Sequence, residues 1–320
     1  MNHSLGWLPD FPSIYDYTTE TKQISDKLKN LGQKDSIHTM LEKIGAFKSG
    51  GALPSSVDLR KWCSPIENQE NIGSCTAHAG IGLVEYFERR AFGKHIDASR
   101  LFLYKTTRNL LHWTGDTGAF LRSTMEALRV FGIPPEEYWK YDTTKFEEEP
   151  TSFCYAFAQN YQAITYYRYD PAGTNKQTLL KTIKTNLATG LPSMFGFTVY
   201  SSINQANSSG KIPFPAPKEK VLGGHAIDAI GYDDNLIIKN TNLKGPETKG
   251  AILIRNSWGT TWGDKGYGWL PYEYILKGLA DDWWSDVQRY YGVSRRDAIR
   301  LGTRAPGRRP TLPGSPTCAP

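Results

Sequence analysis

Three side chains in this sequence could together carry out nucleophilic chemistry on a carbonyl group. Cys75 ends the segment Gln69-Glu-Asn-Ile-Gly-Ser-Cys75, His225 follows a Gly-Gly pair much further along, and Asn256 lies in Arg255-Asn-Ser-Trp-Gly259. A thiol becomes an effective nucleophile when an imidazole accepts its proton, and a third polar group can fix the tautomer and orientation of that imidazole. This order predicts Cys75 as nucleophile, His225 as base and Asn256 as the residue that orients the base.

Further residues near the cysteine and the asparagine complete the expected site. Cys75 is expected to begin a helix entered through Gly73 and Ser74, where unpaired N–H groups and the helix dipole favour the thiolate form. Gln69 would place its side-chain amide beside the backbone N–H of Cys75, which gives two donors for an oxyanion. Trp258 is expected to shield the histidine–asparagine hydrogen bond from water.

The elements that must position these residues fall into two successive zones. Helical periodicity dominates about 54–150, with helices expected near 75–92, 99–110 and 119–131. Strand-like runs dominate about 151–278, at 163–169, 193–199, 225–231, 236–239 and 251–255, with one helix at about 176–189. Helices followed by strands predict an α+β fold, in which an antiparallel sheet or small barrel packs beside the helices. A substrate would lie in the cleft between the two lobes.

Taken in order, the motifs resemble those of the papain family of cysteine proteases. The matching pieces are Gln69, Gly73-Ser-Cys75, His225-Ala226, Asn256-Ser-Trp-Gly259, Trp262-Gly263 and Gly266-Tyr267. The resemblance covers about residues 53–278 and implies a two-lobe fold that hydrolyses peptide bonds in peptide or protein substrates without a cofactor. Asp116-Thr-Gly118 falls where the family has a strip that hydrogen-bonds an extended substrate. The resemblance therefore implies that Asp116, Gly118, Gly224 and Trp258 bind substrate.

Departures from the family pattern leave other interpretations open. Thr76 and His78 stand where Trp and Phe are usual, Gly224 stands where Asp is common, and Ile72 replaces the cysteine of a common disulfide. The two rival functions are a papain-fold acyltransferase, in which an amine outcompetes water, and a catalytically inactive peptide-binding module. His78 is interpreted as a structural histidine rather than as a metal ligand or second proton acceptor. Asp228, on the strand face opposite His225, is given no catalytic role.

Residues 1–52 form a third zone, which is too small to form a folded domain on its own. Its opening is rich in proline and aromatic residues, and short helices are expected near 25–31 and 36–44. The resemblance suggests an inhibitory segment, shorter than is usual and similar to that of microbial relatives. We expect it to lie along the cleft as an intramolecular inhibitor, with Trp7, Phe11 or Tyr15 as anchors.

Composition excludes several other classes of protein. The chain has 320 residues, of which 39% are hydrophobic, and a net charge of +6 that resides in seven arginines and one aspartate after residue 288. The body is therefore neutral and is not expected to bind nucleic acid, and the last part of the 279–320 extension is expected to be disordered. No apolar run or signal segment indicates a membrane partner or export, so the location is unknown and cytoplasmic by default. Four distant cysteines indicate neither a disulfide framework nor a zinc site.

Overall fold

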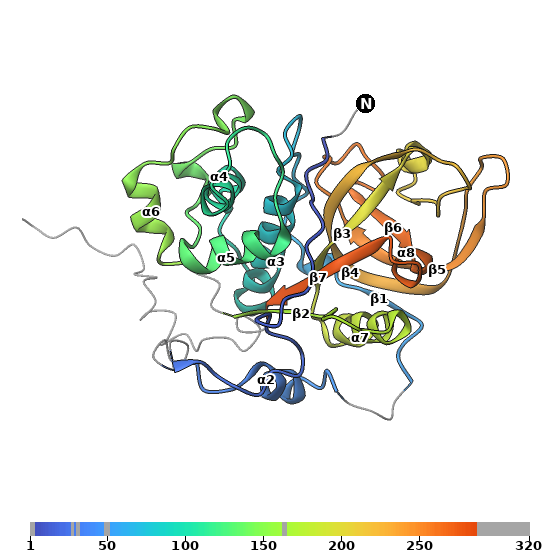
Figure 1. Ribbon diagram of the computed structural model, residues 1–320, viewed down its shortest axis with the longest axis horizontal. Helices are drawn as coiled ribbons and strands as arrows, with labels where there is room; N and C mark the ends of the chain where they lie inside the picture. The colour runs from blue at the N-terminus through green and yellow to red at the C-terminus, as the bar shows by residue number, and fades with distance from the viewer. Residues whose placement is uncertain (1–3, 27–28, 30–32, 48–51, 162–164, 287–320) are drawn as a thin grey trace, which may run out of the picture.

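The computed structural model describes residues 4–26, 29, 33–47, 52–161 and 165–286. Most of the helix expected near 25–31, and the whole of the tail expected to be disordered, lie outside the described residues. Two lobes stand side by side, helices on one side and strands on the other, and the N-terminal segment descends between them (Figure 1). Mixed helices and antiparallel strands confirm the predicted α+β class.

The helical lobe is built around one long, almost completely buried helix, α3 (Cys75–Phe92). Helices α4 (Arg100–Leu110), α5 (Leu121–Val130) and α6 (Ser152–Ala158) surround it. Ser99 caps α4 by accepting a hydrogen bond from the N–H of Phe102, which satisfies one of the unpaired donors of the first turn. Gly93 ends α3 with a φ of 71°, a left-handed conformation that glycine adopts without strain.

The other lobe is a single antiparallel sheet of seven strands. Its order is β2-β7-β3-β4-β5-β6, with β1 paired to β4, and the sheet is open. The strands are β1 (Ser56–Asp58), β2 (Tyr166–Arg168), β3 (Ser193–Tyr200), β4 (Val221–Lys239), β5 (Glu247–Arg255), β6 (Tyr267–Pro271) and β7 (Ala280–Asp286). Strands β3, β4 and β5 lie in the centre, so residues on them are fixed by neighbours on both sides.

Shorter elements cover the rim of the sheet and the base of the molecule. Helices α7 (Lys176–Thr189) and α8 (Tyr272–Leu276) contact each other and the sheet, and α2 (Ile37–Lys43) packs below the lobes (Figure 1). Four 3-10 turns cover Arg60–Trp62, Glu136–Tyr138, Thr143–Lys145 and Ser201–Ala206. Among the described residues, no helix combines the length and apolar content that would let it cross a membrane.

Two expected strand boundaries differ from the structure. The expected strands at 225–231 and 236–239 are one strand, β4, whose pairing with β5 is irregular between Asp233 and Ile237. Strand β7 lies after residue 278, where the catalytic domain was expected to end, yet it pairs with both β2 and β3. Its sequence, Ala-Asp-Asp-Trp-Trp-Ser-Asp, lacks the usual alternation because Asp282 and Asp286 are buried, the first of them paired with Arg168.

Candidate active site

Cys75 is the first residue of α3, as expected, and its thiol is completely buried. Burial raises the pKa of the thiol to about 11. Backbone groups of Ala226, Gly6, Thr76 and Cys75 itself act in the opposite direction, by hydrogen bonding to the sulfur. Because Ala226 directly follows His225, the sulfur lies at the junction between α3 and the central strand β4. In this covered state the thiol is protonated at neutral pH.

His225 of β4 meets Asn256, which directly follows the neighbouring strand β5. Nε2 of His225 lies 2.8 Å from Oδ1 of Asn256, which also accepts a hydrogen bond of 2.8 Å from the N–H of Ser257. An oxygen acceptor assigns the proton of neutral His225 to Nε2 and leaves Nδ1 as the basic nitrogen. Trp258 stacks on the imidazole with the ring centroids 4.5 Å apart. The indole thus covers the imidazole, in agreement with the expected shielding role.

The side-chain amide of Gln69 is held by hydrogen bonds at both its nitrogen and its oxygen, and its N–H groups already donate to backbone carbonyls. Its Nε2 donates to the carbonyl oxygens of Ser4, at 3.0 Å, and Ile72, at 3.1 Å. Its Oε1 accepts a hydrogen bond of 2.7 Å from the hydroxyl of Ser257. Ser257 therefore orients the amide so that Nε2 points to the N-terminal segment, a role for this serine that no motif had indicated.

The N-terminal segment crosses the site as an extended chain that both lobes hold by main-chain hydrogen bonds. Trp7 N donates to Gly224 O at 3.1 Å, Leu8 N to Ala119 O at 3.1 Å, and Ala119 N to Gly6 O at 2.8 Å. Gly118 has a φ of 72°, and a Cβ there would lie 2.2 Å from the Gly6 oxygen. The close approach of the two main chains therefore requires glycine at 118.

Asp116 does not project onto the segment in the way that its expected substrate-binding role suggested. Its Oδ1 accepts hydrogen bonds from Gly73 N, at 2.8 Å, and from the hydroxyl of Tyr104, at 2.5 Å. The same hydroxyl accepts a hydrogen bond of 3.1 Å from Gly118 N. Asp116 and Tyr104 thus tie the loop before Cys75 to the strip at Gly118. A tyrosine inside a helix carries no sequence signal for this role.

Comparisons with known proteins agree with this geometry. Residues 53–277 match the model of the papain family of cysteine proteases. The chain belongs to this family. An uncharacterised peptidase C1-like protein, L477, of Acanthamoeba polyphaga mimivirus is 30% identical over 68% of each chain. The senescence-specific cysteine protease SAG12 of Arabidopsis thaliana is 30% identical over 68% of this chain and 57% of its own.

The fold of this papain-family chain also matches solved structures. Xylellain, a cysteine protease from Xylella fastidiosa, has a TM-score of 0.66 and 30% identity, covering 89% of this chain and 96% of its own. The family assignment confirms the predicted class of cysteine peptidase. The structural match to xylellain covers 89% of this chain, so it extends beyond residues 53–277, which match the family model.

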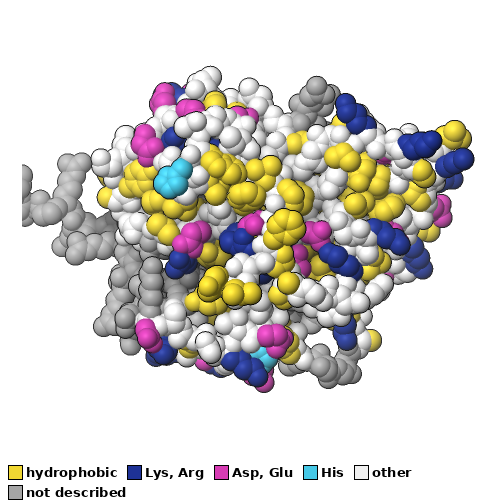
Figure 2. All heavy atoms as spheres, in the orientation of Figure 1, with side chains coloured by type: hydrophobic (Ala, Val, Ile, Leu, Met, Phe, Trp, Pro, Cys, Tyr) yellow, Lys and Arg dark blue, Asp and Glu magenta, His cyan; other side chains and the backbone are white. Residues whose placement is uncertain are grey.

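Only one of the three expected anchors in the N-terminal segment of this papain-family chain is buried. The exposed fraction is 6% for Trp7 but 89% for Phe11 and 87% for Tyr15. Phe11 and Tyr15 are therefore not anchors. Figure 2 shows hydrophobic side chains gathered along the middle of the face seen in Figure 1. In place of Phe11 and Tyr15, ion pairs hold this part of the N-terminal segment: the guanidinium of Arg122 pairs with Asp10 and Asp16.

His78 is bound by its own helix. Its Nδ1 donates a hydrogen bond of 3.0 Å to Ser74 O, one turn back along α3. Burial lowers the pKa of His78 to about 4, so the ring is neutral. The ranges that the structure describes contain no group of three His, Cys, Asp or Glu side chains that could hold a metal ion. These contacts agree with the interpretation of His78 as structural.

A buried ionic cluster lies beside the predicted catalytic residues of this papain-family chain. Arg255 donates to Ser64 Oγ at 3.0 Å and to Pro65 O at 2.8 Å, and its guanidinium lies 3.8 Å from Asp228. Burial raises the pKa of Asp228 well above its usual range, against the effect of Arg255. Burial likewise raises the pKa of Glu85 to about 7. The cluster joins α3 and β4, which carry Cys75 and His225, to the end of β5, which Asn256 directly follows.

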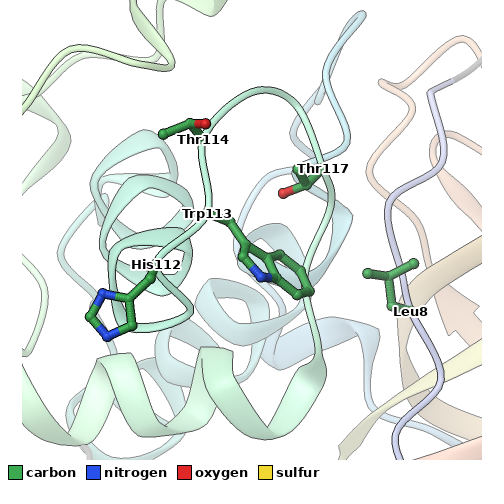
Figure 3. A pocket seen from close by; sticks show the side chains of 5 residues that line it. All are labelled: Leu8, His112, Trp113, Thr114 and Thr117. Carbon is green, nitrogen blue, oxygen red and sulfur yellow. The ribbon is translucent and has the colours of Figure 1, made fainter.

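An open depression flanks the segment on the helical side (Figure 3). His112, Trp113, Thr114 and Thr117 line it, together with Leu8 of the segment. Trp113 projects from the loop after α4, with its ring between this loop and Leu8 in the view of Figure 3. Leu8, which lines the depression, also donates its N–H to Ala119, so the depression lies beside the bound segment.

Proposed function

We propose that this protein hydrolyses peptide bonds with Cys75 as nucleophile, His225 as base and Asn256 as the residue that orients the base. The observation that carries the proposal is the extended main chain of residues 4–8, which runs past Cys75, Gln69 and the Gly118 strip. A groove that holds a polypeptide backbone by hydrogen bonds, beside a thiol and an oriented imidazole, suits a peptide substrate.

The reaction follows from the positions of these groups. Nδ1 of His225 takes the proton of the Cys75 thiol, and the sulfur attacks the carbonyl carbon of the peptide bond. The carbonyl oxygen gains the negative charge and is stabilised by the amide of Gln69 and the backbone N–H of Cys75. The imidazolium then gives its proton to the leaving amine. Water, deprotonated by His225, releases the acyl group and restores the thiol.

We infer that residues 4 to about 26 keep the enzyme latent. Ser4 O occupies the amide of Gln69, Gly6 covers the sulfur, and Trp7 takes the carbonyl of Gly224. The same coverage buries the thiol and raises its pKa, so the nucleophilic thiolate is disfavoured as long as the segment stays. Release of the segment would expose the thiol to water and free the oxyanion donor.

Replacement of the nucleophile tests the catalytic proposal. Cys75→Ala is expected to abolish cleavage of fluorogenic peptides and labelling by a thiol-directed epoxide. Cys154→Ala is the matched control, because it removes another buried thiol, located between Thr151 and Tyr138 in the helical lobe. Full activity of the Cys75 variant, or no cleavage by the unaltered enzyme after release of its segment, contradicts hydrolysis. Mass analysis of products formed with a free amine would detect acyl transfer instead.

Incubation of the purified chain tests latency. Activity is expected to rise together with a new N-terminus before about residue 54, detected by N-terminal sequencing. Alkylation of Cys75 by iodoacetamide at pH 7 should become faster in step with that rise. An intact chain with full activity from the start would mean that the segment is a permanent structural part.

A further inference from the structure

Gly6 of the N-terminal segment lies in a gap just wide enough for one main chain, between the loop that leads into Cys75 and the strip at Gly118. On one side, a Cβ at Gly6 would lie 1.9 Å from the carbonyl oxygen of Gly73. On the other side, a Cβ at Gly118 would lie 2.2 Å from the carbonyl oxygen of Gly6. The two walls therefore approach the main chain of the segment closely from both sides.

The neighbours of Gly6 fix its place in this gap. Its backbone hydrogen-bonds the sulfur of Cys75. In the next residue, Nε1 of Trp7 donates a hydrogen bond of 3.2 Å to Oδ2 of Asp282 on β7. The segment thus marks a path along which a peptide main chain can pass the thiol, and the width of the gap bears on any reaction there.

Three hydrogen bonds in series join the two walls of the gap. Gly73 N donates to Oδ1 of Asp116 at 2.8 Å, and the hydroxyl of Tyr104 donates to the same oxygen at 2.5 Å. Gly118 N in turn donates to that hydroxyl at 3.1 Å. We call this series of hydrogen bonds, from Gly73 through Asp116 and Tyr104 to Gly118, the Asp116–Tyr104 bracket.

The bracket is anchored by Tyr104, which is completely buried in α4. The central carbon of the Arg108 guanidinium, one turn further along α4, lies 4.4 Å from the centroid of the Tyr104 ring. Arg108 is also completely buried and donates a hydrogen bond of 2.6 Å to the carbonyl of Gly115, next to Asp116. Burial, together with the hydrogen bond to Asp116, raises the pKa of Tyr104 well above its usual value, so the hydroxyl keeps its proton and remains a donor.

Disulfides do not add to this connection in the described part of the chain. Ile72 stands where the family commonly has a disulfide cysteine. The cysteines that the structure describes, Cys63, Cys75 and Cys154, are all free thiols. The spacing between the loop and the strip is therefore set here by hydrogen bonds.

We propose that Asp116 and Tyr104 are positioning residues, which set the width of the gap so that a peptide held by the strip presents its carbonyl carbon to the sulfur of Cys75. This inference rests on the proposed peptidase function. Loss of the bracket would leave the reacting groups in place but let the strip shift against the nucleophile. A misplacement of about 1 Å can slow an enzymatic reaction about a hundredfold, so a smaller shift is expected to cost about tenfold.

The test uses the full-length chain, from which a tagged sample of the unaltered enzyme releases the segment before it is removed. Cleavage of a fluorogenic peptide that depends on Cys75 is established first; its absence would end the proposed function, whatever the bracket does. Asp116→Ala is then expected to lower kcat about tenfold and to change KM less than about threefold, because the substrate still binds but is misplaced. Alkylation of Cys75 by iodoacetamide, which is too small to need the strip, should change less than about twofold.

Two results would overturn the proposal. An unchanged kcat would show that the bracket does not position the substrate, and equal losses in kcat and in the rate of alkylation would mean a general disturbance of the site. Asp116→Asn is the conservative variant, because its oxygen can accept the same two hydrogen bonds, and its kcat should stay within about threefold of that of the unaltered enzyme. A loss as large as in Asp116→Ala would contradict a role through hydrogen-bond geometry.

Tyr104→Phe tests the other half of the bracket, and it carries the test alone if Asp116→Ala does not fold. It removes only the hydroxyl and keeps the ring beside Arg108. We expect kcat to fall about tenfold here as well. Tyr86→Phe is the matched control and should leave kcat unchanged, because the hydroxyl of this buried tyrosine donates at 2.9 Å to the carbonyl of Gly190, at the end of α7. Equal values of kcat in the two variants would contradict the proposal.

The double variant shows whether the two residues act as one unit. Either substitution alone breaks the same bracket, so Asp116→Ala combined with Tyr104→Phe should lower kcat no further than the more damaging single substitution. Losses that multiply to about a hundredfold would show two independent roles and would overturn the bracket.

Discussion

Two buried arginines, Arg168 and Arg255, join parts of the molecule in different ways. Arg255 contacts Ser64, Pro65 and Asp228, all within the papain-family region. Arg168 pairs with Asp170 of that region and with Asp282, which lies beyond its end, and also contacts the N-terminal segment, through the carbonyl of Asp10 at 3.2 Å. The comparison separates a permanent ionic cluster beside the predicted catalytic residues from one that links the N-terminal segment to β7, the last strand of the sheet.

The largest expected effect concerns the permanent cluster. Arg255→Met leaves the buried carboxyls of Asp228 and Glu85 without their cation, because the guanidinium lies between α3 and the sheet. Removal of one partner of a buried ionic cluster typically costs about 3–5 kcal/mol. Urea denaturation should show this loss in the free energy of unfolding.

Arg60→Ala is the control for that measurement. Arg60 pairs with Asp58 and Asp264 at the surface, where such pairs contribute less than about 1 kcal/mol. If both variants lose the same small amount, the Arg255 cluster does not support the fold in the way described.

A second prediction uses the pH dependence of the permanent cluster. The pKa of Glu85 is raised to about 7 by burial, above its usual value near 4.5, so the folded state binds a proton more tightly than the unfolded state. Its contribution to stability is therefore complete below about pH 4.5 and is lost as the pH rises through about 7. Glu85→Gln should flatten this part of the pH profile of unfolding, by roughly 3 kcal/mol. A profile that keeps its slope in the variant would assign the titration to another group.

A third prediction addresses the contacts that hold the N-terminal segment on the helical lobe. Arg122 on α5 binds Asp10, Asp16 and the carbonyl of Phe11, so Arg122→Ala should loosen the segment and raise the initial activity of the intact chain about tenfold. Its stability should change little, since the residue is partly exposed.

Arg129→Ala on the same helix is the matched control. Arg129 pairs with Glu126 within α5 and should leave the initial activity unchanged. Equal activation by the two variants would mean that the ion pairs of Arg122 do not hold the segment.

The smallest effect is expected at His78, which lies beside the permanent cluster but carries no charge. Its pKa is lowered to about 4 by burial, and its Nε2 has no hydrogen-bond partner among the described residues. His78→Phe should change the free energy of unfolding by less than about 1 kcal/mol and leave the pH profile of activity between 5 and 8 unaltered. A clear change in that profile would place His78 in the proton chemistry.

Motifs in the sequence predicted most of the candidate catalytic site but little of its support. Cys75, His225 and Asn256 could be singled out because each stands in a distinctive local pattern. Tyr104 and Asp282 could not, because their roles arise from contacts between segments far apart in the chain. Asp116 was expected to bind substrate because it stands beside Gly118 in the sequence. That position shows where the loop lies but not where the carboxylate points.

Strand β7 shows the same limit for the fold. Period-two alternation predicts a strand with one solvated face, whereas Asp282 and Asp286 are buried and Asp282 is compensated by Arg168. An acidic stretch of this kind is typical of a surface segment, and the local sequence does not show that the distant Arg168 pairs with it. The boundary expected at 278 therefore fell before the last strand of the sheet.

The contact between Trp7 and Asp282 spans 275 residues, which sets an order of events during synthesis. Trp7 leaves the ribosome long before the carboxylate that accepts its indole N–H, because Asp282 lies on the last strand of the sheet. Domains form from their N-terminal parts as the chain emerges, but this closure must wait for the final strand. The cleft is thus covered only in a molecule whose sheet is already complete.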